Sequence, residues 1–311
     1  MGDNEIDIHP VTDACWDTER AGLINGSEIG SLFGVGYKTL ARITAEKRDR
    51  SFDDSDPDSP LLERGNDFQE AATKQVQKLR PTWRIIRNTN HYVDRKHRMA
   101  AIPDNLVEAP ERPGIGILEI KVVAAPIFRT QWPDDTPPLK HLLQLEQQMM
   151  LVPGATWGAI GALVVGEFKY QAYVYEIERN LKAESRLRTA VAEFWQKFDA
   201  GDQPVIDFAR DGDLIALMYP AEVPGKIIDL STDNLIGELL ERRENLRATV
   251  KDFEQRLDAC ETEIKSKITD AEIALVNGWR VSLKLQHRKE HMVKASSFRV
   301  LRATRHEKPA P

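Results

Sequence analysis

Residues 99–123 read MAAIPDNLVEAPERPGIGILEIKVV and predict two β-strands joined by a loop. The second strand, over residues 116–123, is rich in Ile, Leu and Val, which is typical of a buried strand. Glu119 and Lys121 interrupt this apolar run two residues apart, so both side chains lie on one face of the strand. Asp104 follows Pro103 at the end of the first strand, and we expect it to lie beside them.

Two interpretations account for these three side chains. Buried charges are costly unless they are paired, and a salt bridge between Glu119 and Lys121, with Asp104 in a turn, would pair them. Alternatively, Asp104 and Glu119 bind a hard cation such as Mg²⁺, and Lys121 orients water or stabilises charge on a phosphate. The Pro-Asp pair and the apolar flanks of both strands favour a site for metal-assisted phosphodiester hydrolysis.

The composition is that of a globular protein with one large domain, or with one domain and an appendage. The chain has 311 residues, of which 41% are hydrophobic and 30% are charged. We expect no signal peptide and no membrane span, because no apolar run is long enough. Cys15 and Cys260 lie far apart, which indicates a reducing compartment without a disulfide framework or a cysteine zinc site. We therefore expect a cytoplasmic protein.

The charge of the chain is unevenly distributed. A net charge of -6 argues against a protein that coats nucleic acid with its whole surface. The segment from Trp279 onward is nevertheless rich in Lys and Arg. A local basic face on an acidic protein predicts a restricted contact with phosphates.

The segment before the central stretch predicts three helices and a strand. Ser27 is expected to cap a helix that runs to Phe33, and further helices are expected over 39–47 and 61–79. The free N–H groups at the Ser27 end favour an anion such as a phosphate, although an ordinary cap explains the same residue. Residues 83–93 predict one strand that leads into the central hairpin.

The segment after the central stretch predicts a helix, two strands and a second helix. These elements are expected over 139–151, 156–165, 169–177 and 181–198. Gln144 and Gln148 share one face of the first helix. Their amides could hold a phosphate or a water near a metal, or they could form a solvated stripe. The order of elements predicts an α/β nuclease core with a mixed sheet over residues 1–204.

The C-terminal third predicts an appended module. Residues 205–230 are expected to form a linker. Apolar residues from Ile236 to Ile264 recur every three or four positions, which predicts a heptad-like helix that pairs with this chain or with a second one. Two basic stretches, WRVSLKLQHRK and SSFRVLRATR, predict short strands in a module over residues 231–311 that contacts DNA or a neighbouring subunit.

Three motifs together resemble the YqaJ-type phage recombination nucleases, relatives of phage lambda exonuclease with a restriction-endonuclease-like core. The resemblance covers about residues 14–200. The P-D…E-x-K signature is met by Pro103, Asp104, Glu119 and Lys121, and the Q-x-x-x-Q-M signature is met by Gln144, Gln148 and Met149. The N-terminal W-x3-R-x-G-x-I-x-x-S-E pattern is met by Trp16, Arg20, Gly22, Ile24, Ser27 and Glu28.

The resemblance implies a Mg²⁺-dependent deoxyribonuclease with two ions, for which Mn²⁺ could substitute. Carried over, the metal ligands are Asp104, Glu119 and the Ile120 main-chain carbonyl, and Lys121 activates water. Gln144 corresponds to the glutamine near the metals, and Gln148 is expected to contact DNA. Arg20 and Ser27 occupy the positions that bind the 5′-phosphate of a DNA end.

The chain departs from the family at two positions. The family carries Gly and then Glu four residues later, whereas here Gly65 is followed at that spacing by Gln69, with Glu70 one residue further. Because an amide is a poorer metal ligand than a carboxylate, Glu70 replaces it, one metal binds more weakly, or the enzyme is impaired. Ile102 stands where lambda exonuclease has a serine before Pro-Asp, so one phosphate contact would be missing.

We expect a 5′→3′ exonuclease of phage or prophage origin that degrades double-stranded DNA and makes single-stranded tails for a strand-annealing partner. The resemblance also implies a homo-oligomer, with a ring that encloses DNA. Two alternatives remain open. One is an endonuclease or flap nuclease of the same fold, and the other is a non-catalytic DNA-end-binding protein.

Overall fold

The computed structural model describes residues 6–12, 19–53, 60–132, 136–287 and 298–303. It divides into two compact units, Met1–Met218 and Tyr219–Pro311, and the boundary lies within the expected linker. None of the described helices is long and apolar enough to cross a membrane.

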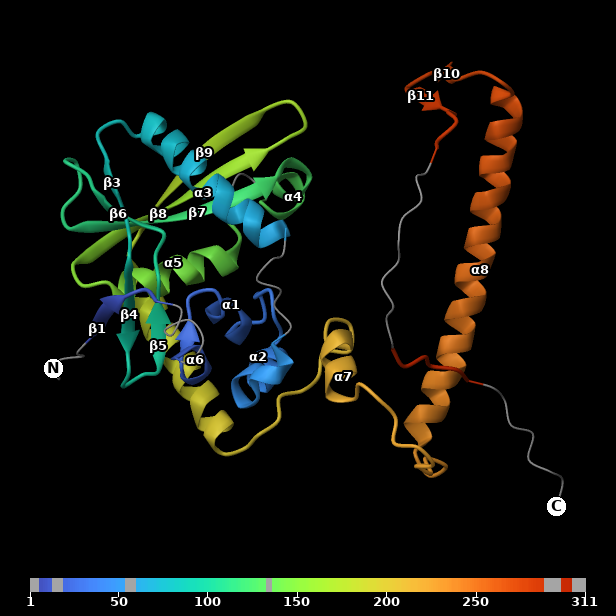
Figure 1. The fold of residues 1–311 in the computed structure, drawn as a ribbon, viewed down its shortest axis with the longest axis horizontal. Coiled ribbons are helices and arrows are strands. Elements are labelled where there is room, and N and C mark those ends of the chain that lie inside the picture. The colour runs from blue at the N-terminus through green and yellow to red at the C-terminus, as the bar shows by residue number, and fades with distance from the viewer. Residues whose placement is uncertain (1–5, 13–18, 54–59, 133–135, 288–297, 304–311) are drawn as a thin grey trace. The chain divides into compact units, whose positions relative to one another are not determined.

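The first unit contains two sheets and the helices that pack on them (Figure 1). Its elements are, in chain order, β1 (Asp7–Pro10), η2 (Arg20–Gly22), β2 (Ile24–Asn25), α1 (Ile29–Leu32), α2 (Leu40–Arg48), η3 (Arg50–Phe52), α3 (Pro60–Leu79), β3 (Arg84–Arg87), β4 (Asn90–Asp94), β5 (Met99–Ala101), β6 (Asn105–Glu108), β7 (Ile115–Ala124), α4 (Ala125–Gln131), α5 (Leu139–Leu151), β8 (Ala155–Val165), β9 (Tyr170–Glu178), α6 (Leu181–Asp199) and α7 (Gly212–Met218).

A five-stranded mixed sheet of order β3-β6-β7-β8-β9 forms the centre of this unit. Among the described strand pairs of this sheet, β7–β8 is the parallel one, and α4 and α5 make the crossover between these two strands. A second sheet of order β1-β4-β5-β2 lies beside it. This architecture confirms the predicted α/β fold class, with a mixed central sheet flanked by helices.

Helices α3 and α5 cover opposite faces of the central sheet (Figure 1). Ile117 of β7 packs in one apolar cluster with Leu145 and Met149 of α5, whereas Leu118 packs in a second cluster with Val76 of α3. This alternation buries both faces of β7, as its continuous apolar sequence predicts.

Two glycines of β8 allow the two helices to approach the sheet closely. A Cβ atom at Gly158 would lie 2.8 Å from Leu145 Cδ1, and one at Gly161 would lie 2.7 Å from Val76 Cγ2. Since both distances are shorter than real Cβ contacts, larger residues here would require the side chains of Leu145 and Val76 to shift away from β8.

The expected strand over 83–93 is wrong, because this segment forms two strands in different sheets. β3 pairs with β6, and β4 pairs with β1 and β5. Asn88 separates the two strands: its side-chain amide donates to the carbonyls of Asn90 and Pro103, and its Oδ1 accepts from the Asn90 N–H. Such local side-chain hydrogen bonds compete with the strand ladder.

The central stretch also differs from the expected hairpin. It forms three strands, because β5 belongs to the second sheet and β6 and β7 belong to the central one. Pro103 lies between β5 and β6, where it supplies no N–H donor to either ladder.

The expected cap at Ser27 is wrong as well. Helix α1 begins at Ile29, and Glu28 occupies the N-cap position without a side-chain cap bond. The Glu28 carboxylate instead accepts hydrogen bonds from the Asn25 N–H at 2.9 Å and from Lys47 Nζ at 3.0 Å. These bonds close the turn before the helix, and Ser27 remains exposed.

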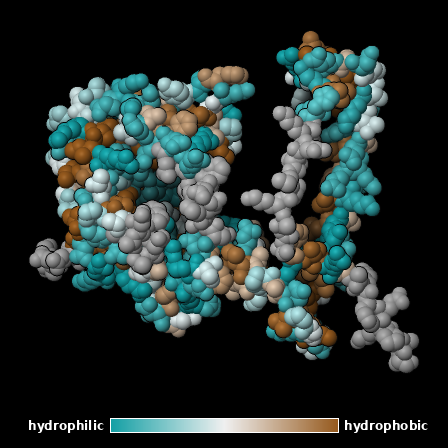
Figure 2. All heavy atoms as spheres, viewed as in Figure 1, coloured by the Kyte–Doolittle hydropathy of each residue, from teal (hydrophilic) through white to brown (hydrophobic). Residues whose placement is uncertain are grey.

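The second unit contains one long helix, α8 (Asn234–Ile268), and a hairpin of β10 (Ile273–Val276) and β11 (Trp279–Ser282). Of the first basic stretch, only Trp279–Ser282 forms a strand. The second stretch lies partly outside the described residues, and residues 298–303 do not form a strand. Most apolar side chains of α8 are exposed and form the brown band along the helix in Figure 2, whereas Ile268 at its C-terminal end is buried.

Candidate active site

Asp104 stands at the start of β6 and contacts β7 through its carboxylate. Its Oδ2 accepts a hydrogen bond from the Ile120 N–H at 2.7 Å. Its Oδ1 accepts a hydrogen bond from Gln69 Nε2 of α3 at 2.6 Å. Asp104 is therefore tied to both the strand and the helix that meet at this end of the sheet.

Glu119 is a buried carboxylate on the α5 face of β7, and it is 3% exposed. Its Oε1 accepts hydrogen bonds from Lys121 Nζ at 2.6 Å and from Gln144 Nε2 at 2.7 Å. Its Oε2 accepts a hydrogen bond from Gln148 Nε2 at 2.7 Å. The two glutamines reach it together because they lie four residues apart on one face of α5.

Lys121 completes this group. Its Nζ also donates a hydrogen bond to Gln144 Oε1 at 3.0 Å. Gln144 therefore binds both charged partners, as an acceptor to the ammonium and as a donor to Glu119. The expected same-face arrangement of Glu119 and Lys121 is present, and both contact the glutamine face of α5.

The charges of the group do not balance, because it contains two carboxylates and one ammonium. Burial, together with the negative charge of Glu119, raises the pKa of Asp104 to about 7. Burial opposes the charge of Lys121, but the Glu119 and Asp104 carboxylates outweigh it and raise the pKa of the ammonium. The site therefore favours an additional positive charge near Asp104.

Gln69 and Glu70, the two alternatives for a third ligand, point to different surroundings. Gln69 binds Asp104, as described above. Glu70 has a side chain that is 80% exposed, and it pairs with Lys74 one turn along α3 at 2.6 Å. The structure therefore brings Gln69, and not Glu70, to the Asp104 carboxylate.

The other expected site residues have different environments. Ile120 pairs with Gly161 in the β7–β8 ladder, and its N–H is the donor to Asp104. The turn that contains Ser27 lies against α5, since a Cβ atom at Gly26 would lie 3.4 Å from Gln144 Cγ. Arg20 begins η2, and its carbonyl accepts a hydrogen bond from Lys47 Nζ at 3.0 Å. Trp16 lies outside the described residues.

Two residues beside Lys121 were not among those that the sequence suggested. His141 is buried, and burial together with the charges of Lys121 and Lys140 lowers its pKa to about 2, so its imidazole stays neutral. Tyr37 is 68% exposed, and its ring centroid lies 3.7 Å from Lys140 Nζ. The Gly-Val-Gly-Tyr turn before Lys38 was the one signal that could have drawn attention to Tyr37.

Comparison with known proteins finds a family model that matches the part of the chain containing this site. A family model described as a YqaJ-like viral recombinase domain matches residues 15–155. This confirms the predicted resemblance to YqaJ-type nucleases. No curated protein matches the chain.

Several solved structures match part of this chain at low sequence identity. An alkaline exonuclease (LHK-Exo) from Laribacter hongkongensis is 16% identical, with a TM-score of 0.47, and the match covers 60% of this chain and 92% of that one. A phage-related exonuclease from Haemophilus somnus 129PT is 12% identical, with a TM-score of 0.41, and the match covers 63% and 96%.

Proposed function

We propose, from the premise that residues 15–155 form a YqaJ-like viral recombinase domain, that the protein is a metal-dependent exonuclease that degrades double-stranded DNA from its ends. The observation that carries this proposal is the surplus negative charge of Asp104 and Glu119, which meet one ammonium. A purely structural ion pair would need only one carboxylate for Lys121.

The residues present fit a divalent cation. Mg²⁺ and Mn²⁺ prefer oxygen ligands, and Asp104 and Glu119 supply carboxylate oxygens from adjacent strands. The raised pKa of Asp104 supports this fit, because a cation near it would offset the cost of burying its charge and the repulsion from Glu119, which now favour the proton.

Asp104, Glu119 and the Ile120 carbonyl would hold the metal, with Gln69 beside Asp104 as a weaker, neutral ligand. When it is bound, a divalent cation stabilises charge on phosphate oxygens and makes water a better nucleophile. The resemblance implies two ions. Because the carboxamide of Gln69 is a weaker ligand than a carboxylate, the ion that it contacts would bind less tightly than the other.

Lys121 would orient the attacking water and stabilise the charge that develops on the phosphate. An ammonium has three N–H donors, and among the described residues Glu119 and Gln144 accept two hydrogen bonds from it. The third donor could therefore reach water or a phosphate oxygen. Gln144 and Gln148 would position Glu119 and Lys121 without adding charge, and Gln148 would also contact DNA.

Arg20 and Ser27 would bind the 5′-phosphate of the DNA end, which gives the proposed 5′→3′ polarity. Ser27 is exposed, and the neighbouring Gly26 lies against Gln144 of α5, which supports a role for this turn beside the glutamine face. Arg20 supplies the positive charge that a terminal phosphate requires.

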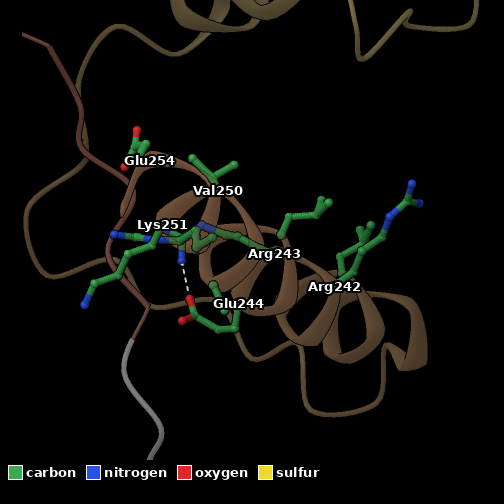
Figure 3. A pocket seen from close by; sticks show the side chains of 10 residues that line it. Arg242, Arg243, Glu244, Val250, Lys251 and Glu254 are labelled. Atoms are coloured by element: carbon green, nitrogen blue, oxygen red, sulfur yellow. Dashed lines mark hydrogen bonds and ion pairs between the residues drawn. The ribbon is translucent and has the colours of Figure 1, made fainter. Parts of the chain in front are cut away.

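The exposed face of α8 supports self-association. Leu246, Val250, Phe253 and Leu257 follow a four-three-four spacing, and each is more than half exposed. Figure 3 shows part of this helix, with Val250 beside charged side chains and with Arg243 donating to Glu244 at 2.7 Å. We therefore expect a homo-oligomer, and the resemblance implies a ring around DNA as its arrangement. The single-stranded DNA tails that the exonuclease produces would then bind an annealing protein in the cytoplasm of a bacterial or phage-infected cell.

Digestion of duplex DNA tests this function. Linear DNA with or without a 5′-phosphate and covalently closed circular DNA are incubated with the protein in Mg²⁺ or in EDTA. The proposal expects metal-dependent loss of the linear duplex alone, faster with a 5′-phosphate. Cleavage of the circle would identify an endonuclease instead.

A second candidate function is a DNA-end-binding protein without catalysis, and Gln69 is the observation that favours it. An amide in place of a carboxylate could weaken the site until it no longer hydrolyses DNA. Retention of linear DNA ends without cleavage, in either Mg²⁺ or Mn²⁺, would select this function.

A further inference from the structure

A second group of potential metal ligands lies in the four-stranded sheet, apart from the residues of the candidate active site. His9 of β1 and His91 of β4 are partners in the antiparallel register, so their side chains stand side by side. Glu19, which directly precedes η2, points its carboxylate at both rings. The ligand atoms of these three residues all lie within 4.8 Å of one another.

The distances within this group match the coordination shell of a metal. Glu19 Oε2 lies 3.4 Å from His9 Nε2 and 3.4 Å from His91 Nδ1. Tetrahedral metal–ligand bonds of about 2.0–2.1 Å place neighbouring ligand atoms roughly 3.3 Å apart. These spacings exceed those of ordinary hydrogen bonds, and they leave room for an ion between the three atoms.

His91 is the buried member of the group. It is 2% exposed, and neither of its ring nitrogens forms a hydrogen bond with a described residue. A buried imidazole without hydrogen bonds is costly. Buried polar atoms in proteins normally have a binding partner, and a metal ion would supply one here. Burial also lowers the pKa of His91, which keeps the ring in the neutral form that binds metals.

The surrounding charges orient the carboxylate and remain favourable to a cation. Arg95 Nη2 donates to Glu19 Oε1 at 3.1 Å, which leaves Oε2 directed at the histidines. Arg95 also pairs with Asp7, so its charge is shared between two carboxylates. Glu19, Asp7 and Arg95 together carry one net negative charge, and the outer contacts resemble those that fix metal-ligating carboxylates.

We propose that His9, Glu19 and His91 form a binding site for a divalent transition-metal ion, with Zn²⁺ as its occupant. Two imidazoles and one carboxylate suit Zn²⁺ far better than Mg²⁺, which prefers an all-oxygen environment. His9 and Glu19 have side chains that are 28% and 25% exposed, so the ion can enter from solvent.

The ion would have a structural role at the N-terminal edge of the unit. It would join β1 to β4, and it would fix the residue that directly precedes Arg20. Three protein ligands leave a fourth position for water. This ion would be distinct from the cation of the candidate active site.

Metal content and thermal unfolding of the full, untagged chain test this proposal. Wild type and H91Q are dialysed against micromolar Zn²⁺ with millimolar Mg²⁺, and bound zinc is then measured. We expect one Zn²⁺ per wild-type chain, loss of that zinc in H91Q, and a rise in Tm on Zn²⁺ addition of roughly 5 °C or more in wild type only. Substitution of Co²⁺ should give the visible absorption of a tetrahedral site.

Matched variants separate the possible outcomes. H287Q removes an exposed imidazole of the second unit and should retain the zinc, whereas E19Q alters a partly exposed ligand and should lose it even if H91Q folds poorly. Equal zinc content in wild type and E19Q would overturn the proposal. Loss of the zinc in D104N but not in E19Q would assign the ion to the candidate active site and also overturn it. A wild type that binds no zinc would likewise overturn the proposal.

Discussion

Two clusters of buried charge in the first unit are built on opposite principles. The α2 cluster consists of Glu28, Lys38, Arg42, Glu46 and Lys47. Glu46 binds Arg42 and Lys38, each at 2.7 Å, and Glu28 binds Lys47 at 3.0 Å. The β7 cluster consists of Asp104, Glu119, Lys121, Gln144 and Gln148, in which two carboxylates share one ammonium and the remaining donors are neutral amides and a backbone N–H.

We propose that this difference separates a structural cluster from a functional one. In the α2 cluster each carboxylate lies within 3.0 Å of at least one cation, so its negative charge is compensated within the protein. In the β7 cluster the amides satisfy the carboxylate oxygens but leave their charge in place, and Asp104 then favours a proton. Such uncompensated charge is costly for folding and is typical of a site that receives a cation.

The largest expected effect is the loss of DNA hydrolysis in Lys121→Ala. This variant removes the one ammonium of the β7 cluster, and we expect initial rates on linear duplex DNA to fall by about 10³-fold. Lys38→Ala is the matched control, since it removes a lysine of the α2 cluster. Its rate per folded molecule should stay within about twofold of wild type. Full activity in K121A would show that the site has been assigned incorrectly.

The second effect concerns stability and should appear in the other cluster. Glu46→Gln removes the carboxylate that Arg42 and Lys38 share, and the Arg42 charge then stays buried without it. We expect the free energy of unfolding to fall by about 2–4 kcal/mol, measured by urea denaturation. The rate of DNA cleavage per folded chain should not change. An unchanged urea midpoint would mean that the α2 cluster contributes little to stability.

The third effect is a gain in stability in Asp104→Asn. We expect this variant to be inactive, because it lacks a proposed metal ligand. The native pKa of Asp104 lies above its unfolded value, so the native state keeps a proton between about pH 4 and 7 that the unfolded chain releases. The contribution of this residue to stability is therefore lost as the pH rises through 7. Asn carries no charge, and Gln69 can turn its amide to bind it.

In EDTA at pH 8 we expect the free energy of unfolding of D104N to exceed that of wild type by about 1–3 kcal/mol. This difference should disappear near pH 4. Urea denaturation at the two pH values provides the measurement. A gain of equal size at both pH values would point to packing rather than to charge as its cause.

The smallest expected effect distinguishes two neighbouring residues of α3. Gln69→Glu adds a third carboxylate beside Asp104, and the Mg²⁺ concentration for half-maximal cleavage should fall about five- to tenfold. Glu70→Gln is the control, because Glu70 faces Lys74 at the surface and its loss should leave the Mg²⁺ requirement unchanged. The reverse result would make Glu70 the third ligand.

Local patterns of sequence predicted much of the first unit. The alternation in residues 116–123 placed Glu119 and Lys121 on one face, and the helix over 139–151 has the expected bounds and presents Gln144 and Gln148 together. These features depend on periods of two and 3.6 residues, which are visible in any sequence.

Features that depend on distant contacts were not predictable in the same way. Asn88 divides an apparent strand because its side chain binds the carbonyl of Pro103. The register of β1 with β4 brings His9 to His91, although 81 positions separate them in the chain. The direction of Gln69 toward Asp104, and of Glu70 toward solvent, follows from how α3 packs on β7, since adjacent helix positions differ in direction by about 100°.

Direct measurement of metal binding tests the central claim, that the negative charge of the β7 cluster binds a cation that is needed for DNA cleavage. Mn²⁺ is titrated into wild type and D104N without DNA, and free Mn²⁺ is followed by electron paramagnetic resonance. The account predicts that wild type binds at least one more ion than D104N, that this ion binds more weakly at pH 6 than at pH 8, and that cleavage of linear DNA appears over the same Mn²⁺ range. Equal binding by the two proteins, or cleavage in EDTA, would contradict it.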